Sequence, residues 1–323
     1  MEGKLVQTYH HAFYFVFPII GLALVYVIIK YVIRHKVSHG IPSTLYAISK
    51  RKGIMARHQM FGSLLTAPIT VGFGGSVGLE GPTVATGAAI SSHIARALHL
   101  NHATRLLLLS CASAGALSSI FKAPIAAIVF AMEVFSLDLT LASLLPLLLA
   151  SISAIITSYF FFGNDALLPF KIVDGFTIAD VPFYMVLGLF GGITSIYFTE
   201  VYTRIQNFFD KLGSPIQRLL LGGVVIGVLV FLVPPLYGEG FDTMNNLVQG
   251  NTDAVLENNF LNLDLNNTWV VIMLLAGLVA FKIVASALTF GAGGVGGIFA
   301  PTLFMGSLMG NCVAKFINHL GIF

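Results

Sequence analysis

The chain has 323 residues, of which 56% are hydrophobic and only 10% are charged, and its formal net charge is +3. An ordinary soluble domain carries about 25% charged residues, so the composition excludes such a domain and indicates a polytopic helical membrane protein. The small net charge excludes nucleic acid as an expected partner. Cys111 and Cys312 lie in apolar segments and predict neither a disulfide nor a metal site.

The apolar segments fall into two classes by length. A full crossing of the bilayer needs about 20 residues, and several segments here are shorter and are interrupted by glycine or proline. Consecutive short segments of that kind are typical of broken or re-entrant helices around a site in the middle of the membrane. In chain order, the sequence predicts a crossing over 12–33, short segments ending near residue 49 and over 59–73, 81–97, 104–121 and 123–137, crossings over 139–162, 181–208, 217–236 and 268–290, and a last helix to about residue 317.

The distribution of charge predicts how the chain is oriented. Basic residues gather in 30–57 and in 204–218, whereas 238–266 carries five acidic residues and neither Lys nor Arg. The positive-inside rule places both basic segments in the cytoplasm and the acidic loop outside. The single crossing over 217–236 is consistent with that assignment.

Two glycine-rich breaks give the chain a weak internal symmetry. Residues 74–82 read GGSVGLEGP and residues 293–301 read GGVGGIFAP, and each break ends at a proline that marks a helix start. Paired breaks in corresponding positions are expected in inverted-repeat transporters. We therefore expect a single transmembrane domain over 1–323, built from two inverted halves of about 1–162 and 181–323.

Glu80 is the residue that most needs an explanation. A charged side chain near the middle of a bilayer costs about 2.5–3.5 kcal/mol on insertion scales, so such a residue is functional by default. Glu80 lies at a helix start between Gly78 and Pro82, and similar helix starts follow Gly40 and Gly297. Helix N-termini carry free N–H groups and about half a positive charge, so three of them directed at one point would bind an anion.

These residues resemble a known family, the CLC chloride channels and chloride/proton exchangers. GLEGP at 78–82 is similar to the family's GxEGP motif, GIFAP at 297–301 to its GxFxP motif, and SHGIP at 38–42 to its GSGIP motif. The resemblance implies an all-α, inverted-repeat fold with broken and re-entrant helices, and a homodimer in a lipid bilayer, expected to be a bacterial inner membrane. It implies no enzyme activity and no cofactor, and the expected ligand is chloride or a similar small anion.

The family's functional residues carry over to the matching positions of this chain. Glu80 would be the gating glutamate, whose carboxylate occupies an anion site and swings away when it is protonated or displaced. The amides of Glu80 and Gly81 would line an outer site, and those of Ile298 and Phe299 a central one. The implied anion-binding residues are Ser38, His39, Gly40, Ile41, Glu80, Gly81, Gly297, Ile298 and Phe299.

Three departures from the family's pattern modify these expectations. His39 stands where the family has a serine that donates to the ion, so selectivity is open between chloride, fluoride and other small anions, with Ser38 as a candidate substitute. Val134 stands at the exchangers' inner proton-transfer position, which favours passive, voltage- or pH-gated conduction. Glu133 beside it is the candidate proton carrier if the chain is instead a proton-coupled antiporter. The family's last helices would follow residue 317 and its first long helix would precede residue 10, so we expect the chain to be incomplete at both ends.

Other interpretations of the same residues stay open. The glycines could serve close helix packing alone. Glu80 could be a structural carboxylate paired with Lys282, although Lys282 could equally add positive potential near the pathway. Lys122 fits either an anion vestibule or an interfacial lysine. Residues 291–296 match a dinucleotide fingerprint but follow a membrane segment instead of a strand. An intramembrane enzyme that uses Glu80 as an acid or base and a membrane scaffold are the rival classes, and anion flux would separate them from a channel.

Overall fold

The computed structural model describes residues 2–37, 40–137, 140–163, 166–169, 175–256 and 267–321, with the backbone alone for 2–12 and 253–254. Within these ranges the chain is all-α, as predicted. The helices are α1 (Glu2–Val27, continued by a π-helical segment Ile28–Ile33), α2 (Ile41–Arg51), α3 (Gly62–Gly72), α4 (Glu80–Ala97), α5 (His102–Phe121), α6 (Pro124–Val134), α7 (Leu141–Phe162), α8 (Val181–Lys211), α9 (Pro215–Leu232), α10 (Phe241–Val248), α11 (Thr252–Leu256), α12 (Thr268–Gly291) and α13 (Phe299–His319).

Full-length and broken helices both occur. Within the described residues, six helices are long and apolar enough to cross a membrane, namely α1 with its π-helical segment, α5, α7, α8, α9 and α12. The prediction that α5 is a short segment was wrong, because its helix runs for 20 residues. By contrast α2, α3 and α6 have 11 residues each. At 1.5 Å per residue such a helix covers about half of the hydrocarbon layer, as expected of a broken segment.

The acidic loop contains structure that the sequence did not reveal. We expected 238–266 to be a polar, acidic loop, and the helices α10 and α11 lie within it. Helix α10 buries Thr243, Met244 and Leu247, which lie on one face at helical spacing. The polar residues between them hid this apolar face in the average composition. Residues 257–266 lie outside the described residues.

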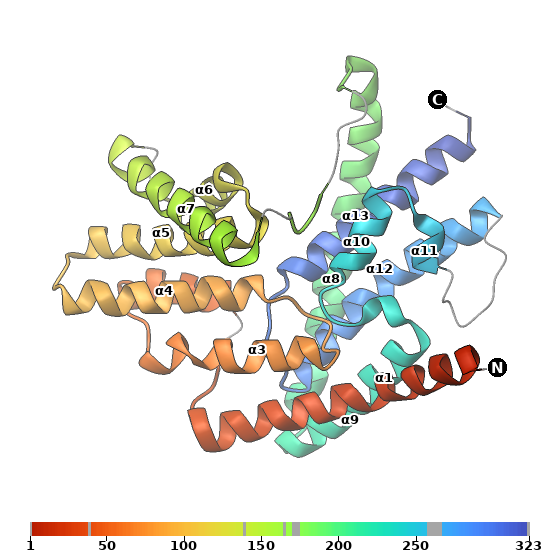
Figure 1. The fold of residues 1–323 in the computed structure, drawn as a ribbon, viewed down its shortest axis with the longest axis horizontal. Helices are drawn as coiled ribbons and strands as arrows, with labels where there is room; N and C mark the ends of the chain where they lie inside the picture. Colours follow the sequence, from red (N-terminus) through yellow and green to blue (C-terminus); the bar gives the residue numbers. More distant parts are fainter. Residues whose placement is uncertain are drawn as a thin grey trace.

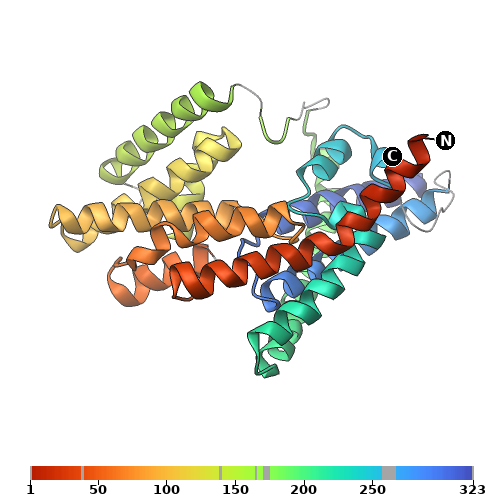
Figure 2. The ribbon, with the colours of Figure 1, turned by 60° about the horizontal axis from the view of Figure 1, so that its bottom comes forward.

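The helices form two groups joined along one side. Helices α4, α5, α6 and α7 pack against one another, and α12 packs against α8, α9 and α13 (Figure 1). Helices α1 and α9 lie side by side in both views (Figure 2), and α3, which packs against both α1 and α4, completes the connection between the groups. The glycine-rich breaks before α4 and α13 meet between the groups.

The two breaks are related by reciprocal hydrogen bonds. Ser76 N donates to Thr289 Oγ1 and Val295 N donates to Thr70 Oγ1, both at 3.1 Å. Gly78 and Gly297 then exchange N–H···O bonds of 2.9 and 2.8 Å, as an antiparallel bridge. One register shift of 219 residues relates Thr70 to Thr289, Ser76 to Val295 and Gly78 to Gly297. This exchange is what a local two-fold axis between inverted repeats requires. The proposed bounds of the halves, about 1–162 and 181–323, stay a prediction.

Thr70→Val and Thr289→Val are expected to destabilise the protein by about 1–3 kcal/mol each, because each leaves a buried N–H group without its acceptor. Both threonines are buried. Thermal unfolding in detergent measures the loss. Thr199→Val is the matched control, since Thr199 is exposed and its hydroxyl bonds only within α8; about 0.5 kcal/mol or less is expected there. Equal losses in all three variants would contradict this account of the two breaks.

Candidate functional site

The three motif segments meet backbone to backbone. A Cβ atom added to Gly40, which precedes α2, would lie 2.6 Å from the carbonyl carbon of Gly81 in α4. A Cβ added to Gly297, which precedes α13, would lie 3.1 Å from Gly81 Cα. Only glycine permits three backbones to approach so closely. The predicted convergence of the three helix N-termini is therefore confirmed.

The N–H groups of these helix starts are largely free of capping side chains. The residues at the N-cap positions of α2, α4 and α13 are Gly40, Leu79 and Ile298, and their side chains contain no hydrogen-bond acceptor. The first N–H groups of a helix have no partner within the helix. Three sets of donors with partial positive charge, none of them capped by the side chain of its own N-cap residue, therefore face one region of the molecule.

The Glu80 side chain lies at the junction of two of these helix starts. Only 1% of the residue is exposed. Its carboxylate lies against the backbone N–H groups of Glu80 itself and of Ala300, which belong to the first turns of α4 and α13. Its Oε2 atom has no hydrogen-bond partner among the described residues. A Cβ on Gly78 would collide with that oxygen. The carboxylate thus lies buried between the first turns of α4 and α13.

Glu239 contacts this junction and Lys282 lies beside the Glu239 segment; sequence reasoning missed the first and suggested Glu80 as a partner of the second. Glu239 Oε1 accepts a hydrogen bond of 2.8 Å from Leu79 N. Lys282 is fully buried, donates to Gly238 O at 2.8 Å, and lies 4.6 Å from the ring centroid of Phe304. The suggested pairing of Lys282 with Glu80 is wrong. Within the described part of the chain the ion pairs are Arg204–Glu200 and Arg218–Asp210.

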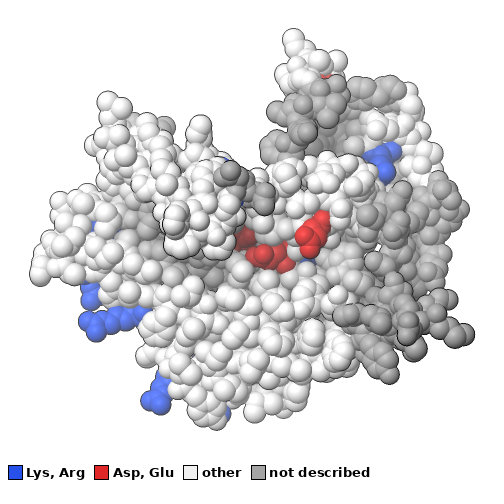
Figure 3. Space-filling model, viewed as in Figure 1, with Lys and Arg blue, Asp and Glu red and all other residues white. Residues whose placement is uncertain are grey.

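Glu239 lies in the segment between α9 and α10, at the edge of a polar vestibule. This vestibule has a volume of about 870 Å³ and is lined by Glu239, Asp242, Tyr14 and Tyr237 among others. Figure 3 shows acidic side chains gathered in a hollow on this face. Burial raises the pKa of the Glu239 carboxyl, while the hydrogen bond from Leu79 and the charge of Lys282 act against that rise. In the sequence, the signal that could have pointed to Glu239 is its position between Gly238 and Gly240, shortly after a double proline.

Aromatic rings hold the start of α13 against the other group of helices. The ring centroid of Phe299 lies 5.6 Å from that of Phe121 in α5 and 6.0 Å from that of Phe130 in α6. Such distances are typical of favourable aromatic pairs. Ile298, one residue earlier, is 42% exposed. Within the GIFAP motif, Phe299 therefore contacts α5 and α6, whereas the side chain of Ile298 is left uncovered.

The remaining predicted residues lie apart from this junction or outside the described part. Ser38 and His39 fall outside the described residues. Glu133 is exposed at the end of α6, and Val134 packs against the core of the α4–α7 group. Lys122 donates to Gly163 O at 2.6 Å and lies 5.2 Å from the Tyr159 ring centroid, so it ties α5 to the end of α7. That contact favours the interfacial interpretation of Lys122 over an anion vestibule.

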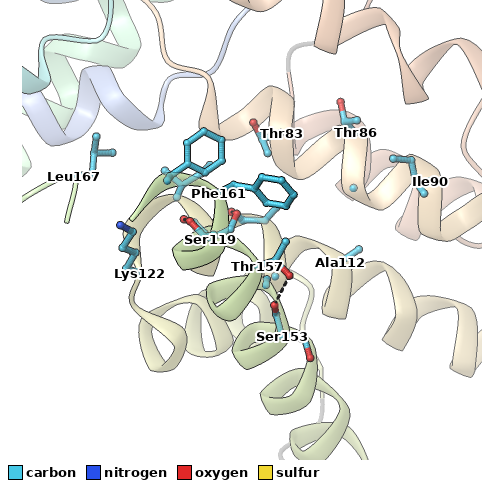
Figure 4. Close-up of a pocket in the computed structure, with 17 residues that line it drawn as sticks. Thr83, Thr86, Ile90, Ala112, Ser119, Lys122, Ser153, Thr157, Phe161 and Leu167 are labelled. Atoms are coloured by element: carbon cyan, nitrogen blue, oxygen red, sulfur yellow. Dashed lines mark hydrogen bonds between the residues drawn. The ribbon is translucent and has the colours of Figure 1, made fainter. Parts of the chain in front are cut away.

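A second cavity lies between α4, α5 and α7. It has a volume of about 790 Å³, and Thr83, Thr86, Ser119 and Thr157 contribute hydroxyl groups to its wall (Figure 4). The Thr157 hydroxyl is bonded within its own helix, to Ser153 O at 2.8 Å. This cavity contains Lys122 at its edge but none of the residues of the three motifs.

The fold and the junction define a class of membrane transport protein, in which inverted repeats of broken helices meet at an anion-like carboxylate. A family model described as "Voltage gated chloride channel" matches residues 21–322, which is nearly the whole chain, so this protein belongs to the voltage-gated chloride channel, or CLC, family. The dinucleotide, enzyme and scaffold interpretations therefore have no support from the family.

Individual relatives agree with this assignment. The chain is 29% identical over 300 residues to a ClcB-like protein of Ralstonia nicotianae named as a chloride channel, covering 91% of this chain and 65% of the relative. It is 30% identical over 248 residues to the H(+)/Cl(-) exchange transporter ClcA of Vibrio cholerae, covering 74% of this chain and 49% of the relative. The chain thus spans about half to two thirds of the length of these curated relatives.

Two solved structures share the fold. The crystal structure of a CLC-type fluoride/proton antiporter matches with a TM-score of 0.66 and 22% identity, over 92% of this chain and 70% of that one. A slow cyanobacterial Cl-/H+ antiporter matches with a TM-score of 0.77 and 19% identity, over 95% of this chain and 69% of that one. The predicted inverted-repeat fold with broken helices is confirmed by these likenesses.

Proposed function

We propose that this chain moves small anions across the membrane and that Glu80 is its gate. The observation that carries the proposal is the position of the Glu80 carboxylate against the N–H groups of two helix N-termini. A permeating anion needs the same donors, because it must replace its water shell with partial positive charges. The carboxylate and the ion therefore compete for one site.

The proposed mechanism follows from this competition. When Glu80 is ionised it occupies the site between α4 and α13 and excludes the anion. Protonation removes its charge and weakens its hold on the N–H groups, so the side chain leaves and an anion enters. The donors would be the amides of Glu80 and Gly81 on the outer side and of Ile298 and Phe299 further in, with Gly297 permitting the close approach. Gly40 and Ile41 would begin the helix that completes the site from the cytoplasmic side.

Passive conduction is our first choice of transport mode, and proton-coupled exchange is the alternative. Val134 at the inner position cannot carry a proton, which supports conduction. The exchange alternative is supported by relatives named as exchangers, and Glu133 is then the proposed inner proton carrier. Its side chain is exposed on α6.

The experiment is a flux measurement on the protein in liposomes with a proton gradient imposed. We expect anion flux with a reversal potential that follows the anion gradient alone. A reversal potential that moves toward the proton gradient would favour exchange, and an absence of anion flux would contradict the proposal as a whole. Parallel measurements with chloride and fluoride decide selectivity, for which Ser38 and His39 are the proposed determinants.

The proposed surroundings are a bacterial plasma membrane and a second copy of the chain. Helix α8 supports a surrounding of lipid or of a second copy. None of the residues in its most apolar stretch is buried within the molecule. A surface of that kind needs lipid or protein against it. We propose no cofactor other than the bound anion.

A further inference from the structure

We propose that Glu239 is the second carboxylate of the gate, and that its charge at the N-terminus of α4 sets the pH at which Glu80 becomes protonated. Glu239 would be a positioning residue that acts through Glu80, with no contact of its own to the ion. The consequence for transport rests on the proposed gating function of Glu80, whereas the effect on the protonation of Glu80 does not.

Leu79 N donates a hydrogen bond of 2.8 Å to Glu239 Oε1. Leu79 is the N-cap residue of α4, and Glu80 is the next residue in the chain. A carboxylate at this position uses one of the free donors of the helix start and is stabilised by its partial positive charge. The Glu80 carboxylate lies against its own N–H group, which belongs to the same helix start. Two carboxylates therefore share the positive end of one helix.

The two carboxylates also interact with each other. Glu80 is almost completely buried, Glu239 is half-buried, and the two repel each other electrostatically. Two nearby carboxylates in a site with little water do not ionise independently, because the charge of one disfavours the charge of the other. An ionised Glu239 therefore favours the protonated form of Glu80, which is the form that leaves the anion site.

Two groups favour the ionised form of Glu239, namely the Leu79 N–H group and Lys282. Lys282 lies beneath the same segment, where its Nζ donates to Gly238 O, and its charge acts on Glu239. The other described titratable groups around Glu239 are Asp242 in α10, which is exposed, and the phenols of Tyr14 and Tyr237. Lys282 is thus a positive group whose charge acts on Glu239, and it partly counteracts the burial that raises the pKa of this carboxyl.

Glu239 and Glu80 differ in their access to the vestibule. Glu239 lines the vestibule of about 870 Å³, whereas Glu80 behind it is closed to water. The predicted topology places this acidic segment outside the cell. Glu239 is therefore placed to make Glu80 respond to external pH.

The test compares Glu239→Gln with the wild type and with Asp242→Asn. The glutamine keeps an oxygen that can accept from Leu79 N, so the variant removes the charge and preserves the hydrogen bond. Asp242→Asn removes the same charge from the same vestibule at a water-exposed position. The midpoint of Glu80 protonation is read from the infrared band of its carboxyl group, assigned by the loss of that band in Glu80→Gln. The pH midpoint of anion flux in liposomes is read in parallel.

We expect both midpoints to fall by about one pH unit in Glu239→Gln, the size of effect that a neighbouring charge typically has, and to change much less in Asp242→Asn. The direction follows because loss of a neighbouring negative charge makes ionised Glu80 easier to form. Glu239→Asp, which keeps the charge, should remain closer to the wild type than Glu239→Gln does.

An unchanged infrared midpoint in Glu239→Gln, or a shift equal to that of Asp242→Asn, would overturn the inference. A shifted infrared midpoint without any pH response of wild-type flux would instead overturn the proposed gate and leave the coupling between the two carboxylates standing.

Discussion

Replacement of Glu80 by glutamine is expected to raise anion flux at neutral pH by about tenfold or more and to make it independent of pH. The glutamine side chain has a similar shape but no charge, so it does not compete for the N–H groups of α4 and α13 as an anion does. If the tethered carboxylate is favoured over the free ion by only ~1.4 kcal/mol, it blocks the site in about nine of ten molecules. Removing that competitor should therefore give the neutral-pH protein the flux that the wild type reaches only in acid.

The measurement is chloride efflux from liposomes over a range of external pH, with Glu200→Gln as the control. Glu200 is an exposed glutamate on α8 that pairs with Arg204, so its loss removes one carboxylate without touching the junction. We expect this control to keep the full pH response. A Glu80→Gln protein that retained that response would show that another group senses the proton, and the gating role would have to be given up.

Most of the fold could be predicted because membrane segments carry their signal locally. Hydropathy and length locate α7, α8, α9 and α12 directly, since every residue facing lipid must be apolar. The glycine-rich breaks likewise predicted the helix starts at Glu80 and Phe299 and their convergence. In each case the information lies within about 20 consecutive residues. Helix α10 was not predicted, because it has only eight residues and its three buried residues lie among polar ones.

The sequence predicted which backbone segments form the candidate site. It did not predict which charged side chains surround that site. The positions of Glu80, Gly81 and Gly297 follow from motifs, which are contiguous. Glu239 is 160 residues from its partner Leu79, and no local pattern indicates that a glutamate in a polar loop will bond to that amide. The sequence left two roles open for Lys282, a pairing with Glu80 or a positive potential near the pathway; the pairing was wrong, because no local pattern shows that Lys282 bonds to Gly238. Long-range partners of buried charges need the tertiary structure.

Gly40→Ala is expected to destabilise the protein by roughly 2–6 kcal/mol, which is a large share of a typical stability of about 5–15 kcal/mol. Two effects add. Gly40 has φ +77° and ψ −127°, a backbone conformation that is open to glycine but costs other residues about 1–3 kcal/mol. The new methyl group would also lie 2.6 Å from the carbonyl carbon of Gly81, and overpacking of this kind costs about 1–3 kcal/mol where the neighbour is backbone and cannot turn aside.

Thermal unfolding and the yield of monodisperse protein in detergent measure this loss, with Gly306→Ala as the control. Gly306 lies in α13, near the same junction, but a Cβ added there meets no atom within 4 Å. Alanine also favours a helix over glycine by about 0.5–1 kcal/mol, so the control should be neutral or slightly stabilising. A Gly40→Ala protein as stable as Gly306→Ala would mean that α2 and α4 can separate freely. The three helix starts could then not hold a partly dehydrated ion between them, because such a site depends on donors fixed in place before the ion arrives.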